Sequence, residues 1–312
     1  MNLAFGPVPS RRLGRSLGIN NIPSKFCSYS CVYCQIGRTK NLTIERRSFY
    51  NPNLILKEVL NIIEKCVKPP NYITFVPDGE PTLDKNLGAE ASLLKSELGL
   101  PLAILTNSSL LFKSDVKRDL ALFDLVSLKV DAFSQKIWRK INRPHKLLDL
   151  DEIRKGIRRF SKEFSGVLIT ETMLIEGINT DAKEIEGIAS FLLEIEPNKA
   201  YIAVPTRPPA EKWVKPASEE NLVKAHEIFA QSLGRSRIEL LTGYEGPGFH
   251  LAGDPIEALL SILSVHPMRI NYAYESLSKA GLNPEETIQT LLRMEKIRLV
   301  EYRGERFLVK KL

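Results

Sequence analysis

Three cysteines crowded into eight residues constrain this chain more than any other feature of its sequence. They stand in Cys27-Ser-Tyr-Ser-Cys31-Val-Tyr-Cys34, a C-x3-C-x2-C spacing, and the fourth cysteine, Cys66, lies apart from them. Four cysteines in 312 residues are too few for a disulfide scaffold, so this crowding predicts metal ligation or redox chemistry. We therefore expect a loop that presents three thiolates together.

Three thiolates on one short loop match three corners of a cubane iron–sulfur cluster, which leaves the fourth iron without a protein ligand. Zinc is a competing interpretation, but a zinc site usually pairs two C-x2-C-like elements or adds nearby histidines, and the nearest histidine is His145. An ordinary electron-transfer cluster is a further alternative. Cys66 is a candidate fourth ligand, although its helical surroundings favour a small buried apolar residue.

The composition is that of a globular protein with an ample core. No stretch approaches the roughly 18–20 apolar residues of a membrane-spanning helix. Proline and arginine interrupt the N-terminus where a signal peptide has its apolar core, so we expect a cytoplasmic protein.

Positive charge is concentrated around the cysteines. Residues 1–50 contain eight basic side chains and one acidic side chain, Glu45. This excess favours an anionic cofactor or substrate, which a basic N-terminal arm would hold or cover. The alternative is that these arginines pair with acids elsewhere in the chain.

Short apolar runs alternate with helical patterns between residues 16 and 241. The expected strands are 16–22, 72–76, 102–105, 125–130, 166–174, 200–204 and 238–241. The expected helices are 54–63, 86–98, 114–122, 151–164, 182–195 and 218–232. This α/β alternation predicts a parallel sheet with helices outside it, and six or so units favour a partial (β/α)6 barrel.

The pattern changes near residues 243–255, where glycines and prolines accumulate. Helical patterns at 256–264, 269–280 and 284–295 precede two strand-like runs joined by a turn at Arg303 and Gly304. Three helices and a hairpin predict a small α+β winged-helix-like domain. We therefore expect a barrel domain at 1–245, which includes the basic arm, and a winged helix-turn-helix at 255–312.

The cysteine motif, with Tyr33 just before its last cysteine, resembles the signature of radical S-adenosylmethionine (radical SAM) enzymes. A second segment, Asp78-Gly79-Glu80-Pro81-Thr82 at the end of the next strand, resembles that family's Gly-Gly-Glu-Pro motif. The family motif contacts the amino group of the methionyl moiety, and here Asp78 replaces its first glycine. A carboxylate and backbone carbonyls are the acceptors that an ammonium needs, and Gly79 permits close approach.

The resemblance also implies that polar strand ends share one ligand-binding face of the barrel. Its metal ligands are Cys27, Cys31 and Cys34, which hold a [4Fe–4S] cluster. The implied contacts to S-adenosyl-L-methionine are Tyr33, Gly79, Glu80, Pro81, Asn107, Ser127, Lys129, Asp131, Gly177, Asn179 and Val204. It implies no catalytic residue beyond the cluster.

Residues 5–20 and 35–39 look like a subgroup of iron–sulfur oxidoreductases related to the wyosine-forming tRNA enzymes. Those enzymes carry extra N-terminal cysteines for a second cluster, whereas this chain has none before Cys27. The resemblance implies an external electron donor and reductive cleavage of S-adenosylmethionine. The product is a 5′-deoxyadenosyl radical that takes hydrogen from a substrate.

The sequence leaves the substrate open. A pI near 9.1 and basic residues at both ends favour RNA, with tRNA modification as the reaction. A peptide, protein or small metabolite is the alternative, with the winged helix as a docking module. A third interpretation is a non-catalytic redox sensor that binds DNA, but a sensor would not need the motif at 78–82.

Overall fold

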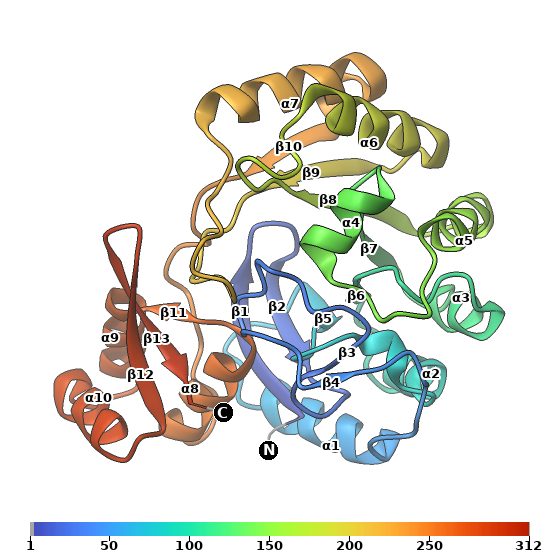
Figure 1. The fold of residues 1–312 in the computed structure, drawn as a ribbon. Helices are drawn as coiled ribbons and strands as arrows, with labels where there is room; N and C mark the ends of the chain where they lie inside the picture. The colour runs from blue at the N-terminus through green and yellow to red at the C-terminus, as the bar shows by residue number, and fades with distance from the viewer. Residues whose placement is uncertain (1–2, 312) are drawn as a thin grey trace.

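The structure is a computed structural model that describes residues 3–311, and an eight-stranded sheet forms its centre (Figure 1). The strand order is β1-β2-β5-β6-β7-β8-β9-β10. All neighbours from β2 to β10 are parallel, as predicted, and only β1 pairs antiparallel. The strands are β1 (Ala4–Ser10), β2 (Gly14–Ile19), β5 (Tyr72–Phe75), β6 (Leu102–Thr106), β7 (Leu125–Lys129), β8 (Val167–Met173), β9 (Lys199–Ala203) and β10 (Ile238–Leu241).

Helices cover the outer face of this curved sheet (Figure 1). Side chains alternate between faces along a strand, so Ile104, Val126 and Ile202 point outward and are fully buried against the helices. Because the outer face is covered by helices, the strands are mostly apolar, and polar residues such as Thr74, Lys129 and Glu171 occur on the inner face. The helices are α1 (Pro52–Ile63), α2 (Leu87–Leu98), α3 (Ser114–Leu120), α4 (Gln135–Asn142), α5 (Leu150–Glu163), α6 (Ala182–Ile195) and α7 (Glu219–Leu233).

The N-terminal segment is a hairpin, β1–β2, rather than the arm expected from the sequence. Within residues 3–311 no pairing joins β1 to β10, so the sheet curves without closing. Leu13, at the hairpin turn, is buried against Leu125, Ile169 and Tyr201 on the inner face. The turn therefore fills one end of the space that the sheet surrounds and places Arg11 and Arg12 beside that space.

Short elements surround the cysteine motif. Two-residue strands, β3 (Phe26–Cys27) and β4 (Asn41–Leu42), pair with each other, and a 3-10 turn, η1 (Pro81–Leu83), follows the second motif. A bridge between Phe26 and Gly79 joins the two motifs directly. A second 3-10 turn, η2 (Arg235–Arg237), precedes β10.

Residues beyond β10 build a second core. Its elements are α8 (Pro255–Val265), β11 (Met268–Arg269), α9 (Ile270–Lys279), α10 (Pro284–Arg293), β12 (Ile297–Tyr302) and β13 (Glu305–Lys310), and the sheet order is β11-β13-β12. Arg303 and Gly304 turn the β12–β13 hairpin, as expected. We call this part, residues 255–311, the C-terminal unit; its assignment as a winged helix stays a prediction.

The C-terminal unit packs on the central sheet. Phe5 and Val8 of β1 belong to the same buried cluster as Leu259 and Ile262 of α8. The C-terminal unit therefore shares its core with β1. Among the described residues, no helix combines the length and apolar content needed to cross a membrane.

Candidate functional site

The cysteine motif forms a loop between β2 and α1 that α4 holds in place. Ser30 and Val32 donate backbone hydrogen bonds to the carbonyls of Asn142 and Ile141, at 3.0 and 2.9 Å. Asn142 also donates its side-chain amide to the sulfur of Cys31, at 3.4 Å. The sequence did not predict α4, yet this helix fixes the middle of the cysteine loop.

The sulfur atoms sit among hydrogen-bond donors. The backbone amide of Tyr29 and the side-chain amide of Asn107 each approach Cys27 Sγ at 3.5 Å. Burial raises the pKa of Cys31 to about 12, and the pKa values of Cys27 and Cys34 are also raised, first by burial. Such thiols ionise when a metal stabilises the thiolate, and N–H donors to sulfur stabilise it further.

The three cysteines, all half-buried and free of disulfides, fit the ligand set of an iron–sulfur cluster. They share one loop, they receive N–H donors, and two of them border a cavity. Between residues 3 and 311, no group of three His, Cys, Asp or Glu side chains converges on a single-ion position.

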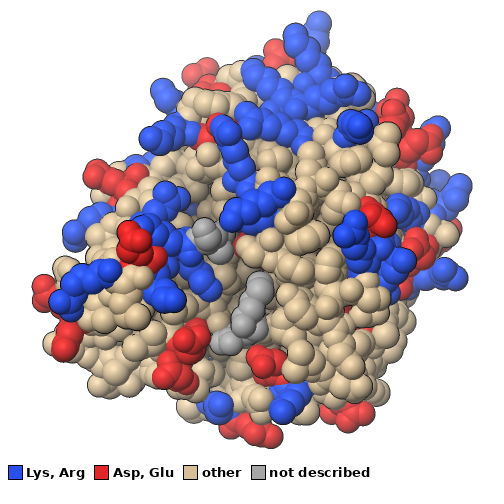
Figure 2. Space-filling view, turned by 60° about the horizontal axis from the view of Figure 1, so that its bottom comes forward, with Lys and Arg blue, Asp and Glu red and all other residues tan. Residues whose placement is uncertain are grey.

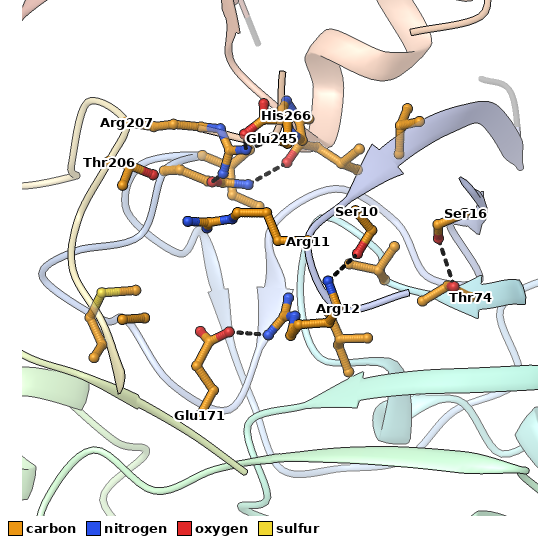
Figure 3. Close-up of a pocket in the computed structure, with 18 of the residues that line it drawn as sticks. Ser10, Arg11, Arg12, Ser16, Thr74, Glu171, Thr206, Arg207, Glu245 and His266 are labelled. Carbon is orange, nitrogen blue, oxygen red and sulfur yellow. Dashed lines mark hydrogen bonds and ion pairs between the residues drawn. The ribbon is translucent and has the colours of Figure 1, made fainter. Parts of the chain in front are cut away.

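A cavity of about 350 Å³ lies on the inner face of the sheet (Figure 3). One side, which we call the cysteine wall, consists of Cys31, Tyr33, Cys34 and Gln35. Another, the cationic wall, consists of Arg11, Arg207, Glu245 and His266. Inward-facing strand residues, among them Thr74, Leu105, Lys129, Glu171 and Ala203, line the space between them.

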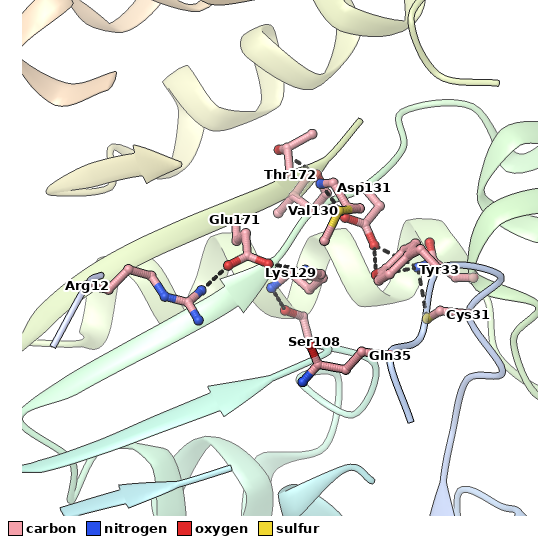
Figure 4. A network of polar contacts seen from close by, with 12 residues as sticks. Arg12, Cys31, Tyr33, Gln35, Ser108, Lys129, Val130, Asp131, Glu171 and Thr172 are labelled. Atoms are coloured by element: carbon pink, nitrogen blue, oxygen red, sulfur yellow. Dashed lines mark hydrogen bonds and ion pairs between the residues drawn. The ribbon is translucent and has the colours of Figure 1, made fainter. Parts of the chain in front are cut away.

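Two cations share one carboxylate inside this cavity. Arg12 and Lys129 both pair with Glu171 (Figure 4). Burial opposes ionisation of Glu171, but Arg12 and Lys129 hold its pKa at about 2. Burial likewise opposes the charge on Lys129, but Glu171 and Asp131 raise the pKa of this lysine. All three groups are therefore charged at neutral pH, with a net positive charge.

Lys129 also lies beside the cysteine wall. Its ammonium stands 5.2 Å from the ring centroid of Tyr33, and the Tyr33 hydroxyl donates to Asp131. The other Asp131 contacts are the side-chain amide of Asn142, at 2.8 Å, and the backbone amide of Met173, at 2.9 Å. Asp131 thus orients Tyr33 and ties β7 to β8.

Glu80 is buried and holds two strand ends together. One carboxylate oxygen accepts bonds from the Thr82 amide and from the hydroxyls of Thr82 and Thr106. The other accepts the backbone amide of Asn107, at 2.7 Å. The side chain therefore positions the loops after β5 and β6.

Gly79 is required where the two motifs touch. A Cβ atom at this position would lie 1.9 Å from the carbonyl oxygen of Phe26, just before Cys27. The sequence predicted that Gly79 permits close approach of a cofactor, whereas the close approach seen here is to the cysteine loop. A larger residue would displace that loop.

Asp78, which replaces a family glycine, forms a buried ion pair with Lys25. Lys25 Nζ lies 3.6 Å from Asp78 Oδ1, and Ser24 donates its hydroxyl to the other oxygen at 2.5 Å. Burial raises the pKa of Asp78, and Lys25 opposes this shift. The pair adds a buried ammonium group close to the cysteine loop.

The structure gathers some of the expected cofactor contacts and not others. Tyr33, Lys129 and Val204 line the cavity with Cys31 and Cys34. Asn179 has a structural role instead, because its side-chain amide donates to the carbonyls of Asp131 and Met173. The expected residues outside the cavity lining are Cys27, Gly79, Glu80, Pro81, Asn107, Ser127, Asp131, Gly177 and Asn179.

Sequence reasoning missed most of the cationic wall. Arg207 donates to Gln35 Oε1 at 2.8 Å and to Glu245 Oε2 at 2.6 Å, and it contacts His266 Nε2 at 2.7 Å. Gln35 also donates to the carbonyl of Val265, at 2.9 Å. The C-terminal unit is thus part of the cavity wall. Only the positive excess in residues 1–50 gave a signal, for Arg11 and Arg12.

Comparisons with known proteins show the family and the fold. A UPF0026 protein of Methanocaldococcus jannaschii is 48% identical over 313 residues, which cover 100% of this chain and 97% of that protein. Among solved structures, TYW1 with a lysine-pyruvate adduct bound has a TM-score of 0.55 and 14% identity, and the match covers 72% of this chain and 82% of that one.

A radical SAM methyltransferase from Sphaerobacter thermophilus also has a TM-score of 0.55, with 18% identity over 73% of this chain and 66% of that one. At these identities the two structures show a shared fold. The family model for the radical SAM superfamily matches residues 21–192, which include both motifs. The chain therefore belongs to the radical SAM superfamily and, within it, to the UPF0026 proteins.

Proposed function

We propose that this protein is an enzyme that binds a [4Fe–4S] cluster on Cys27, Cys31 and Cys34 and cleaves S-adenosylmethionine reductively. The observation that carries the proposal is the cysteine loop itself. Its sulfurs receive N–H donors, and two of its cysteines border a cavity on the inner face of the sheet. An external electron donor is required, because the chain holds no second cysteine cluster.

The cluster, when bound, supplies one electron to the sulfonium C–S bond, which yields methionine and a 5′-deoxyadenosyl radical that takes a hydrogen atom from the substrate. The chain's residues position the reactants and exclude water. Lys129 shares Glu171 with Arg12, so its ammonium has capacity left for the carboxylate of the methionyl group. Leu105, Met173 and Val204 make part of the cavity apolar.

The substrate class that the geometry favours is a small molecule. A cavity of about 350 Å³ lies within the size range of small-ligand sites. Basic and acidic side chains both lie on the face shown in Figure 2. RNA modification and docking of a partner on the C-terminal unit stay predictions from the sequence.

Anaerobic reconstitution with iron and sulfide, followed by reduction in the presence of S-adenosylmethionine, tests the proposal. We expect about four irons per wild-type chain and formation of 5′-deoxyadenosine and methionine. Cys31→Ala should lose both the cluster and the cleavage, and Cys66→Ala should keep both. Zinc in place of iron, or a wild-type protein that forms no 5′-deoxyadenosine, would refute the proposal.

A further inference from the structure

The cationic wall and its neighbours carry more positive than negative charge. Four cations, Arg11, Arg12, Lys129 and Arg207, line the cavity together with two carboxylates, Glu171 and Glu245. Burial lowers the pKa of His266 from its usual value, with Arg207 acting in the same direction, so this histidine is neutral at pH 7. A cavity with this excess attracts anions.

One of the two excess positive charges resides at Arg11, and the other belongs to the Arg12–Glu171–Lys129 group. Arg207 is paired with Glu245, and Arg12 shares Glu171 with Lys129. Among the residues that the structure describes, Arg11 pairs with no carboxylate; its guanidinium donates to the backbone carbonyl of Gly243. Desolvation of the guanidinium lowers the pKa of Arg11 and Arg207 acts in the same direction, whereas Glu171 and Glu245 oppose this shift; the residue as a whole is exposed. Two guanidinium groups in mutual repulsion are stabilised by an anion placed between them.

The hairpin turn holds Arg11 in a defined position. Ser10 Oγ accepts the backbone amides of Arg12 and Leu13, at 3.4 and 3.2 Å, and Leu13 is buried in the inner face of the sheet. Figure 3 shows the Arg11 side chain reaching into the cavity between Arg12 and Arg207. This arginine is therefore oriented before any ligand arrives, which reduces the entropic cost of binding.

Two more nitrogen atoms in the same wall have no hydrogen-bond partner in the part of the chain that the structure describes. They are Arg207 Nε and His266 Nδ1, both buried. His266 Nε2 lies 2.7 Å from an Arg207 guanidinium nitrogen and 3.2 Å from Glu245 Oε1, and Nδ1 is a donor in the tautomer that carries the proton there. Buried donors without partners are uncommon in native structures, and a bound water or ion is a usual explanation.

We propose that the substrate is a small molecule with a carboxylate or phosphate group, and that Arg11, together with Arg207 and His266, binds that group. The apolar part of the substrate lies against Val8, Leu105 and Met173, which line the same cavity. The description of this ligand as a substrate rests on the proposed function. The anion site itself exists in the chain without cluster or S-adenosylmethionine.

Binding measurements on the cluster-free protein test the site. The probes are phenyl phosphate and phenylacetate, with benzyl alcohol as the uncharged control, followed by calorimetry at low and moderate salt. We expect at least one anion to bind more tightly than benzyl alcohol. Arg11→Gln should weaken this binding at least tenfold, and Arg11→Lys by less, since lysine keeps the charge without the planar fork. Comparison of the two anions shows whether the group is phosphate or carboxylate.

Arg15→Gln is the matched control, because Arg15 lies on β2, outside the cavity lining, and donates to the carbonyl of Pro69. It should bind the anion within twofold of wild type. The inference is overturned by anions that bind no better than benzyl alcohol, by equal losses in the Arg11 and Arg15 variants, or by binding that depends on Lys129 and not on Arg11. If Arg11→Gln does not fold, Arg11→Lys decides the outcome.

Because no cofactor is present, these results are independent of the cleavage assay. Anion binding without formation of 5′-deoxyadenosine would refute the proposed function and leave the site intact. Formation of 5′-deoxyadenosine without anion binding would support the proposed function and refute the anion site.

Discussion

The cysteine wall and the cationic wall border the same cavity, but their polar groups are satisfied differently. Behind the cysteine wall, Glu80 and Asp131 use both carboxylate oxygens on protein N–H and O–H groups. In the cationic wall, within residues 3–311, Arg11 pairs with no carboxylate, and Arg207 Nε and His266 Nδ1 have no hydrogen-bond partner. The chain itself therefore fixes these two carboxylates behind the cysteine wall, whereas we propose that a ligand completes the cationic wall.

This contrast predicts that the largest effects come from small changes behind the cysteine wall. Gly79→Ala places a methyl group 1.9 Å from the Phe26 carbonyl, so the cysteine loop must move. We expect loss of most bound iron and a decrease of about 3 kcal/mol in the free energy of unfolding, measured by iron analysis and urea titration. Gly243→Ala is the control, because a Cβ there meets open space. Normal iron content in Gly79→Ala would contradict the direct contact between the motifs.

Glu80→Gln tests whether stability depends on a carboxylate behind the cysteine wall whose two oxygens both accept hydrogen bonds. Glutamine cannot accept the Asn107 amide and the three Thr82 and Thr106 donors together, so one buried donor is left without an acceptor. The expected loss of unfolding free energy is about 2 kcal/mol. The exposed Glu97→Gln should change stability little. Equal stability of both variants would show that the network contributes nothing to the wall.

In the cationic wall, Glu245→Gln should have opposite effects on stability and binding. The loss of the carboxylate weakens the contact to Arg207, at a cost of about 1 kcal/mol. The cavity also becomes more positive, so the anion that wild type binds best, phenyl phosphate or phenylacetate, should bind a few-fold more tightly. Calorimetry measures the change, and weaker binding of that anion would show that Glu245 takes part in recognition.

The smallest expected effect is a pH dependence at His266. Its pKa is lowered, first by burial and then by Arg207, so the unfolded chain takes up this proton at a higher pH than the folded chain. The resulting stability is complete above pH 6.5 and is lost as the pH falls toward the lowered pKa. His266→Gln should flatten the decrease in melting temperature between about pH 7 and pH 5.5. Parallel curves for the two proteins would exclude this assignment.

Much of the sheet could be predicted from the sequence, because a strand buried on both faces is a continuous apolar run. β5 to β10 lie within one residue of the expected bounds. β1 was missed because Gly6, Pro7 and Pro9 interrupt it, and only an edge strand tolerates such residues. α4 was missed because it is only eight residues long, although its apolar residues Ile137, Trp138 and Ile141 have helical spacing.

The site residues likewise include some that the sequence could predict and some that it could not. The cysteine ligands follow from local spacing, since three residues on one loop stay close however the chain folds. Glu245 and His266 reach the cavity only because the C-terminal unit packs on β1, and no local spacing signals that contact. Arg207 depends on it as well, because it bridges Gln35 and His266.

Gln35 stands directly after Cys34 and links the cysteine loop to the end of α8 through the Val265 carbonyl. A truncated chain that ends before residue 255 would therefore not form a self-sufficient barrel. This truncation would remove the hydrogen bond that anchors Gln35, expose Phe5 and Val8 to solvent, and open the cavity to water on one side. A shorter variant of this protein therefore needs a replacement for this side of the cavity in order to keep water away from a radical.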